Sequence, residues 1–356
     1  MDWEYIEEDV WQRLRREARP IALYGMGDGA QKILRVFEQY GIRASAVFAS
    51  DEFVRGHSFM GFPVERLSQV TARLGPDIAI VIAFASQRPE VLEKMYELDR
   101  QYDVAAPDVP VAGEGLFDRD FTVRHADELS RAYGMLSDET SRRVFADTVA
   151  FKLTGRLSFL RRCETGKDEA FRAILCPGAR EHFVDLGAYN GDTIRELLAY
   201  TGGQYASITA LEPDRKNCKK LQKYVDDALG GRAAVLHAGA WNEDTAMAFA
   251  ARAGRNSALA AAGIRTPMRA VDSVLSGAPC TLLKMDVEGA ERHALEGARE
   301  TIRRCRPKLN IAAYHRNEDL FDLPLLVHEL CPAYRLYLRH HPYVPAWDTN
   351  LYAAAD

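Results

Sequence analysis

The chain has 356 residues, of which 47% are hydrophobic and 27% charged, and its formal net charge is −5. This composition is typical of a globular protein with room for two domains, and the negative charge argues against a nucleic-acid partner. The six cysteines form no C-x-x-C pair, and no apolar run approaches the roughly 20 residues of a membrane-spanning helix. We therefore expect a cytoplasmic protein with reduced thiols and no membrane insertion; a homo-oligomer stays open.

Residues 1–19 predict an N-terminal helix. Apolar side chains recur there at spacings of three and four, as on one face of an amphipathic helix. They are Trp3, Ile6, Val10, Trp11 and Leu14.

Residues 20–115 predict a small Rossmann-like α/β domain, because strand-like runs alternate with helix-like segments. Gly25, Gly27 and Gly29 follow the first of these strands, and Asp51 ends the second. Glycines in such a turn admit a phosphate to the helix N-terminus, and the acid would face a ribose. We expect these four residues to bind a nucleotide-linked ligand, with a module that binds nothing as the alternative.

The stretch Gly56 to Val64 resembles the G-x-x-x-x-G-x-P-V segment in N-terminal modules of sugar-modifying enzymes, including nucleotide-sugar acetyltransferases. Residues 116–180 then predict a helical connector, with Phe145, Val149 and Leu153 spaced by four. Its basic residues suit solvated helix faces, with an anionic group docked there as the alternative.

Residues 181–356 predict a second α/β domain that opens with a strand, a tight turn and a helix. Phe183 to Leu186 form the strand, and glycines at 187 and 191 let backbone N–H groups approach a ligand closely. The turn matches neither G-x-G-x-x-G nor a P-loop. Residues expected to bind the cofactor here are Asp185, Gly187, Ala188, Tyr189, Asn190, Gly191, Asp192 and Thr193.

Glu212 closes the next strand, Ser207 to Leu211, at the distance where an acid would hold two ribose hydroxyls. Asp185 could hold a cationic amino-acid group. A nucleoside joined to a zwitterionic amino acid fits this pair of acids better than a dinucleotide does. The sequence therefore favours S-adenosylmethionine as the cofactor.

Further cofactor contacts are expected along the following segment. Pro213 is expected in the first turn of a helix that ends at Gly230. Ala240 and Trp241 follow the third strand, where a class I methyltransferase would meet the adenine. Strands at 245–251 and 264–270 are expected to flank a loop at 254–257.

The densest cluster of charges lies at the ends of two later strands. Lys284, Asp286 and Glu288 follow one apolar strand, and His315 follows another. In an open α/β sheet, the carboxyl ends of the strands mark the site. We expect all four residues to be catalytic, with Asp286 also near the cofactor.

Of these four, His315 is expected to accept the acceptor's proton, with a pKa near 6.5. Asp286 and Glu288 would position the reacting groups. One alternative is a divalent metal held by Asp286, Glu288 and His315. Another is a purely structural pair between Lys284 and Asp286 or Glu288.

These motifs together resemble the FkbM family of S-adenosylmethionine-dependent methyltransferases, over roughly residues 170–355. The matching pieces are Phe183 to Ala188, Asn190 to Thr193, Glu212–Pro213, Lys284 to Glu291 and the run from Tyr314 to Ala353. The resemblance implies a class I methyltransferase fold and O-methylation of sugar or polyketide-type hydroxyls. It supplies no confirmed catalytic base.

The sequence thus predicts an O-methyltransferase that acts on a hydroxyl of a sugar, glycan or nucleotide-linked small molecule. Alternatives are an N-methyltransferase on an amino sugar and a nucleotide-sugar-binding protein whose methyltransferase half is degenerate. A nicotinamide-dependent oxidoreductase is the least favoured, because residues 20–112 show no catalytic constellation. The acceptor, the N-terminal ligand, metal dependence and oligomeric state stay open.

Overall fold

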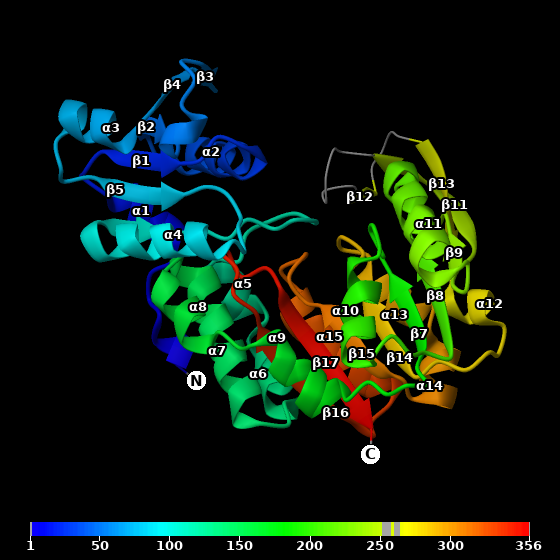
Figure 1. Cartoon of the computed structure of the whole chain (residues 1–356). Helices are drawn as coiled ribbons and strands as arrows, with labels where there is room; N and C mark the ends of the chain where they lie inside the picture. Colours follow the sequence, from blue (N-terminus) through cyan, green and yellow to red (C-terminus); the bar gives the residue numbers. More distant parts are fainter. Residues whose placement is uncertain (1, 251–257, 260–263, 356) are drawn as a thin grey trace.

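The computed structural model describes residues 2–250, 258–259 and 264–355 and shows two α/β units with a helical segment beside them (Figure 1). The predicted α/β fold is confirmed. The loop expected at 254–257 lies outside the described residues. Within the described ranges, no helix combines the length and apolar character that crossing a membrane requires.

The N-terminal unit is built on a six-stranded sheet with the order β3-β4-β2-β1-β5-β6. All pairs are parallel except β3 with β4. The strands are β1 (Ile21–Tyr24), β2 (Ala44–Phe48), β3 (Ser58–Phe59), β4 (Phe62–Glu65), β5 (Ala79–Ile82) and β6 (Asp103–Ala105).

Helices cover both faces of this sheet, which explains why its central strands are apolar at every position. Leu23 and Val81 share a core with α1 (Val10–Arg16) and α2 (Asp28–Tyr40). The alternate residues, such as Ile80, pack with α3 (Leu67–Leu74), α4 (Pro89–Gln101) and part of the connector.

The prediction of one continuous helix over residues 3–19 is wrong. A 3₁₀ turn, η1 (Asp2–Tyr5), is followed by a break, and α1 begins only after Asp9. The Asp9 carboxylate accepts the backbone N–H groups of Trp11 and Gln12, so it caps α1 at a new start.

The connector is helical, as predicted, and packs on both sheets. Phe145, Val149 and Leu153 belong to the core of the C-terminal unit, whereas Phe151 belongs to the core of the N-terminal unit. Its elements are α5 (Arg119–Arg124), α6 (Ala126–Met135), α7 (Glu139–Thr154), α8 (Leu157–Cys163), α9 (Lys167–Glu169) and a π-helical turn, η3 (Ala170–Leu175).

The C-terminal unit has a seven-stranded sheet with the order β16-β17-β15-β14-β7-β8-β9. Strand β17 is antiparallel to both neighbours, and the pairs from β15 to β9 are parallel. The strands are β7 (His182–Leu186), β8 (Ser207–Leu211), β9 (Ala234–Leu236), β14 (Leu282–Met285), β15 (Lys308–Ala312), β16 (Tyr334–His340) and β17 (Thr349–Ala355).

A four-stranded sheet adjoins it, with the order β10-β13-β11-β12. Its strands are β10 (Gly239–Ala240), β11 (Thr245–Ala250), β12 (Ala258–Leu259) and β13 (Ile264–Arg269). The helices of the unit are α10 (Asp192–Tyr200), α11 (Arg215–Leu229), α12 (Val271–Leu275), α13 (Glu291–Glu296), α14 (Arg299–Cys305) and α15 (Asp319–Leu330).

Pro213 does not occupy the first turn of α11, which corrects the prediction. Asp214 caps that helix instead, because its carboxylate accepts the N–H groups of Lys216 and Asn217. The predicted glycine stop is confirmed, since Gly230 is left-handed at the C-terminus of α11.

The segment between β16 and β17 reaches back to the N-terminal unit. Val344 pairs with Ser86, which lies just beyond β5, through hydrogen bonds of 2.8 and 3.0 Å. The carboxyl ends of both parallel sheets thereby contribute to one space between the units.

Candidate active site

A glycine turn joins β7 to α10 and lies in close contact with the end of β14. Gly187 has φ of 77°, and a Cβ there would lie 1.9 Å from the backbone oxygen of Asp286. Gly191 has φ of 85°, and a Cβ there would lie 2.7 Å from the Tyr224 ring. Only glycine fits both positions, so the turn brings backbone against the Asp286 segment.

Behind this turn, Lys284 and Asp185 form a buried ion pair. The Nζ atom of Lys284 lies 3.3 Å from Asp185 Oδ1 and donates a hydrogen bond of 3.1 Å to the carbonyl of Gly187. Burial raises the pKa of Asp185 to about 6. Burial would lower the pKa of Lys284, but Asp185 and Asp286 outweigh it, so the ammonium stays charged. Lys284 therefore pairs with Asp185, rather than with Asp286 or Glu288, the partners considered in the alternative of a structural pair.

Glu212 sits beside the same turn. Its two oxygens accept the backbone N–H groups of Tyr189 and Asp214, each at 2.8 Å. Burial raises the pKa of Glu212 to about 7. Each oxygen can accept a further hydrogen bond, so the side chain both fixes the turn and offers acceptors to a ligand.

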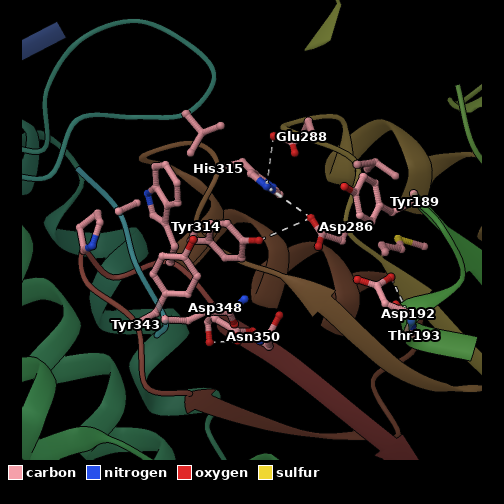
Figure 2. A pocket seen from close by; sticks show the side chains of 18 of the residues that line it. Tyr189, Asp192, Thr193, Asp286, Glu288, Tyr314, His315, Tyr343, Asp348 and Asn350 are labelled. Carbon is pink, nitrogen blue, oxygen red and sulfur yellow. Dashed lines mark hydrogen bonds and ion pairs between the residues drawn. The ribbon is translucent and has the colours of Figure 1, made fainter. Parts of the chain in front are cut away.

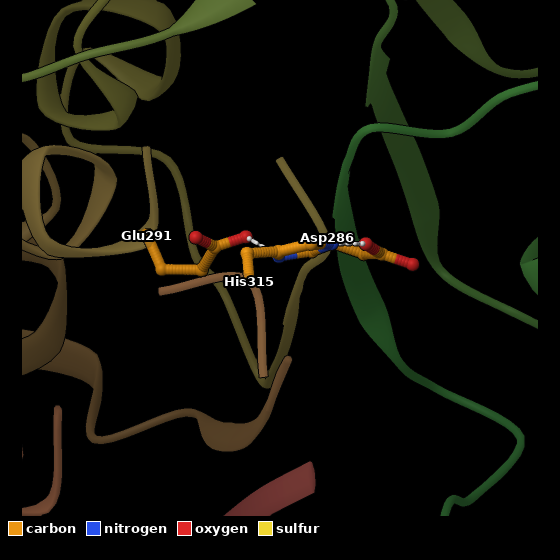
Figure 3. A group of neighbouring side chains, drawn as sticks. All are labelled: Asp286, Glu291 and His315. Carbon is orange, nitrogen blue, oxygen red and sulfur yellow. Dashed lines mark hydrogen bonds and ion pairs between the residues drawn. The ribbon is translucent and has the colours of Figure 1, made fainter. Parts of the chain in front are cut away.

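His315 lies at the centre of a line of carboxylates. Its Nδ1 is 2.8 Å from Glu291 Oε1, and its Nε2 is 3.4 Å from Asp286 Oδ1 and 3.7 Å from Glu288 Oε2 (Figures 2 and 3). Glu291 also accepts the backbone N–H of Val287 at 2.8 Å. It follows that Nδ1 carries a proton directed at Glu291, while Nε2 faces Asp286 and Glu288.

This environment changes the pKa expected for His315. Burial would lower the pKa of His315, but the carboxylates of Glu291, Asp286 and Glu288 outweigh it and raise the pKa to about 10. At neutral pH the ring is an imidazolium without a free lone pair. The ordinary pKa near 6.5 that the sequence predicted for His315 is therefore contradicted, whereas its role as the proton acceptor stays a prediction.

Sequence reasoning missed Glu291 and Tyr314. Glu291 is fully buried at the start of α13, and the Tyr314 hydroxyl lies 3.5 Å from Asp286 Oδ1. A glutamate in the first turn of an apolar helix was the available signal, but such residues also stabilise helix N-termini without any other role.

These groups open into a cavity of about 660 Å³ that both α/β units line. Its volume falls within the range of small-molecule sites. The predicted residues that line it are Gly27, Gly29, Gly187, Tyr189, Asp192, Thr193, Glu212, Pro213, Ala240, Lys284, Asp286, Glu288 and His315.

Other predicted residues do not line the cavity. Asp185 lies behind Lys284, and Ala188 belongs to the hydrophobic core. The Trp241 ring packs on His293, with 3.8 Å between centroids. The remaining residues of this group are Gly25, Asp51, Asn190 and Gly191.

Packing explains most of the N-terminal glycine cluster. A Cβ on Gly25 would lie 2.8 Å from the Phe84 ring, and one on Gly29 would lie 2.7 Å from the Ala83 oxygen. The Asp51 side chain is exposed on the surface, 3.9 Å from Arg66. The structure thus does not bring Asp51 to the glycines that it was expected to join.

The methyltransferase FkbM domain model matches residues 185–345. Among solved structures, the methyltransferase FkbM of Methylobacillus flagellatus shares 22% identity with a TM-score of 0.73, covering 99% of this chain and 96% of that one. An rRNA methylase of Streptococcus thermophilus has 13% identity and a TM-score of 0.34, over 53% of this chain and 92% of that one. A comparison with curated proteins gives no match.

The family model does not extend to residues 20–115, so the resemblance of that unit to modules of sugar-modifying enzymes stays a prediction. The whole-chain likeness to the Methylobacillus protein shows a shared fold. The glycine turn, Glu212 and the His315 cluster thus lie within residues 185–345, the part of the chain that is similar to the methyltransferase FkbM domain.

Proposed function

We propose that the protein is an S-adenosylmethionine-dependent methyltransferase that methylates a hydroxyl group of a sugar or glycan. The observation that carries the proposal is the shared cavity. The glycine turn and Glu212 line it together with Asp286 and His315, so the residues proposed to bind the cofactor and those proposed to act on the acceptor face one space. The match to a methyltransferase FkbM domain over the same residues supports it.

The cofactor would supply an electrophilic methyl group next to a sulfonium leaving group. This chain would bind it through the turn at 187–193, whose residues Gly187, Tyr189, Asp192 and Thr193 line the cavity. Glu212 would add its remaining acceptor capacity. The buried ammonium of Lys284 lies at the same end of the cavity. We therefore place Lys284 with the cofactor rather than among the catalytic residues.

Asp286 is the residue that accepts the proton in this proposal. Its side chain is 40% exposed, whereas His315 is buried, so Asp286 can contact an acceptor hydroxyl. A carboxylate oxygen can take the proton as the new C–O bond forms. The His315 imidazolium and the Tyr314 hydroxyl hold Asp286 in place. His315 is then a positioning residue.

The donor set also fits a divalent metal. Asp286, Glu291 and His315 offer ligand atoms within 4.8 Å of one another. Because Glu291 lies on the Nδ1 side of the ring (Figure 3), an ion at Nε2 would take Asp286 and Glu288, with Glu291 orienting the ring. Such an ion would lower the pKa of the acceptor hydroxyl. If a chelator abolishes the activity and Mg²⁺ or Mn²⁺ restores it, the metal-assisted reaction is favoured over the metal-free one.

The test compares three variants, with the methyl group of S-adenosylmethionine labelled and a cell extract as the acceptor source. We expect Asp286→Asn to lower turnover by about 10²–10⁴-fold while the affinity for S-adenosylhomocysteine changes less than about threefold. His315→Ala should lower turnover without lowering that affinity. The exposed Asp226→Asn on α11 is the control. Full turnover in Asp286→Asn would refute the assigned base, and absence of cofactor binding in the parent protein would refute the function.

A further inference from the structure

We infer that the acceptor carries no phosphate where it occupies the cavity, and that the N-terminal unit helps to impose this selection. The acceptor class is an uncharged or cationic polyhydroxyl compound, rather than a nucleotide-linked one. The inference rests on the proposed function, because it concerns the second substrate of the same cavity. It also replaces the nucleotide-linked acceptor that the N-terminal glycine pattern suggested.

The charges that line the cavity are the first argument. The carboxylates of Asp192, Glu196 and Glu212 lie at the cofactor end. Further carboxylates come from the second half of the site and from the N-terminal unit: Asp286, Glu288, Asp348 and Asp28. The cations are fewer, namely three lysines and the His315 imidazolium held among its carboxylates, and no arginine occurs among the described residues that line the cavity. Proteins bind phosphate groups with arginine forks, lysines or unobstructed backbone N–H groups.

Each lysine of the lining already has a carboxylate beside it. Lys284 lies 3.3 Å from Asp185, and Lys167 lies 3.1 Å from Asp348. Lys32 lies 3.6 Å from Asp28 and donates a hydrogen bond of 3.1 Å to the carbonyl of Pro110. A phosphate would have to displace these partners, and it would still face the surrounding carboxylates.

The N-terminus of α2 is the second argument. Helix N-termini attract anions through free N–H groups and the helix dipole. Here the first turn carries Asp28, whose side chain is 49% exposed and lines the cavity. The negative charge therefore stands where a phosphate would approach, and it lies on the N-terminal unit rather than on the methyltransferase domain.

The cavity wall on the far side from the glycine turn suits an uncharged sugar ring. Tyr343 and Asp348 lie on the side of Asp286 that faces away from Tyr189 and Thr193 (Figure 2). The rings of Tyr343 and Trp347 are 5.8 Å apart and offer apolar surface. Beside them, Asn350 donates a hydrogen bond of 2.8 Å to Asp348, and the amide oxygen of Asn350 can accept a hydrogen bond from a hydroxyl group.

This wall is shared between the two units. The backbone pairing of Ser86 with Val344 fixes the 343–348 segment against the end of β5. Phe84 and Gln87, from the N-terminal unit, line the same cavity. An acceptor held against Tyr343 thus contacts residues from both ends of the chain, while Asp28 repels a phosphate that it carries.

The first experiment titrates the protein, saturated with S-adenosylhomocysteine, with UDP-glucose and with inorganic pyrophosphate by calorimetry. We expect dissociation constants above about 1 mM for the wild type. Asp28→Lys should bind UDP-glucose at least about fivefold more tightly, because it replaces repulsion by attraction. Glu38→Lys, the same charge change at an exposed position of α2 outside the cavity, is the matched control.

Binding of UDP-glucose to the wild type below about 0.1 mM would overturn the inference. An equal gain in affinity for UDP-glucose in Asp28→Lys and Glu38→Lys would overturn the role given to Asp28. Unchanged affinity for S-adenosylhomocysteine in both variants checks that each variant folds.

The second experiment offers labelled S-adenosylmethionine and a cell extract separated by anion exchange into retained and unretained pools. We expect methyl label in the unretained pool, in a product that phosphatase and pyrophosphatase leave unchanged. Label confined to retained, phosphatase-sensitive products would overturn the inference. Absence of label in both pools would count against the proposed function, whereas the UDP-glucose titration tests the charge selection independently.

Discussion

The pKa of His315 can be tested by removing one charge behind the ring. Glu291→Gln keeps the shape of the side chain, and its amide oxygen can still accept from His315 Nδ1 and from the Val287 N–H. Glu291 Oε2 has no hydrogen-bond partner among the described residues, so the new amide nitrogen displaces no existing bond. The substitution therefore removes the charge and little else.

The expected size follows from the geometry. Two unit charges about 4 Å apart interact by about 4 kcal/mol at an effective dielectric constant near 20. One pKa unit corresponds to about 1.4 kcal/mol, so losing Glu291 should lower the pKa of His315 by about 2–3 units. Starting from about 10, the imidazole of the variant should titrate between about 7 and 8.

The assay is NMR of protein labelled with ¹³C at the histidine ε1 carbon, with a chelator present and His315→Gln used to assign the resonance. In the wild type this resonance should show no titration between pH 6 and pH 9. In Glu291→Gln its midpoint should move into that interval, whereas Glu300→Gln, an exposed substitution on α14, should leave it unchanged. A wild-type midpoint near 6.5 would refute the reasoning and restore His315 as a candidate base.

Three further results are expected. Glu212→Ala should weaken binding of S-adenosylhomocysteine by about 30-fold in calorimetry, since it removes a charged acceptor; equal affinity would contradict the assignment. Gly187→Ala should lower the free energy of unfolding in urea by about 2–4 kcal/mol, because its Cβ meets backbone at 1.9 Å, whereas Gly202 also has a positive φ but no atom near its Cβ, so Gly202→Ala should cost about 1 kcal/mol. The free energy of unfolding should also fall by on the order of 2–4 kcal/mol from pH 7 to pH 10. His315, raised to about 10, contributes fully below pH 6.5 and loses that contribution as the pH rises, and buried Asp319, raised to about 8, acts in the same direction; a rise in stability would contradict both shifts.

Elements with clear local signals could be predicted from the sequence. Strand β8 occupies Ser207 to Leu211 as expected, because an apolar alternation ends at Glu212–Pro213. Helix α4 starts at Pro89, a local signal that the sequence carries because proline favours the first turn of a helix. The helix predicted from residue 3 failed because a capping aspartate at position 9 outweighed the apolar periodicity.

Residues of the site could be predicted from the sequence only where the order of the strands alone determines their position. Residues at the carboxyl ends of neighbouring parallel strands meet, which is why Glu212, Asp286 and His315 share the cavity. Pairings across the fold were not predictable. Lys284 meets Asp185 because β14 and β7 place these residues side by side in register, and no spacing in the sequence encodes that neighbour.

The pKa of His315 could not be predicted from the sequence either, because it depends on contacts across the fold. An imidazole after a strand has an ordinary pKa unless buried charges surround it. Here α13 delivers Glu291 to one ring nitrogen, and the turn after β14 delivers Asp286 and Glu288 to the other. The raised pKa of His315 depends on that three-dimensional convergence.

The strand order of the C-terminal sheet constrains how the protein is assembled. Among the described residues, the sheet partner of strand β16 is β17, which follows it in the chain and separates it from β15. During synthesis β16 can form its bridges to Leu136 and Glu164 of the connector, but it gains its sheet partner only when residues 349–355 have emerged. A polypeptide that stops before residue 349 loses two strands rather than one, together with Asn350 from the cavity wall. Affinity tags that hinder this hairpin would thus impair the active site from a distance.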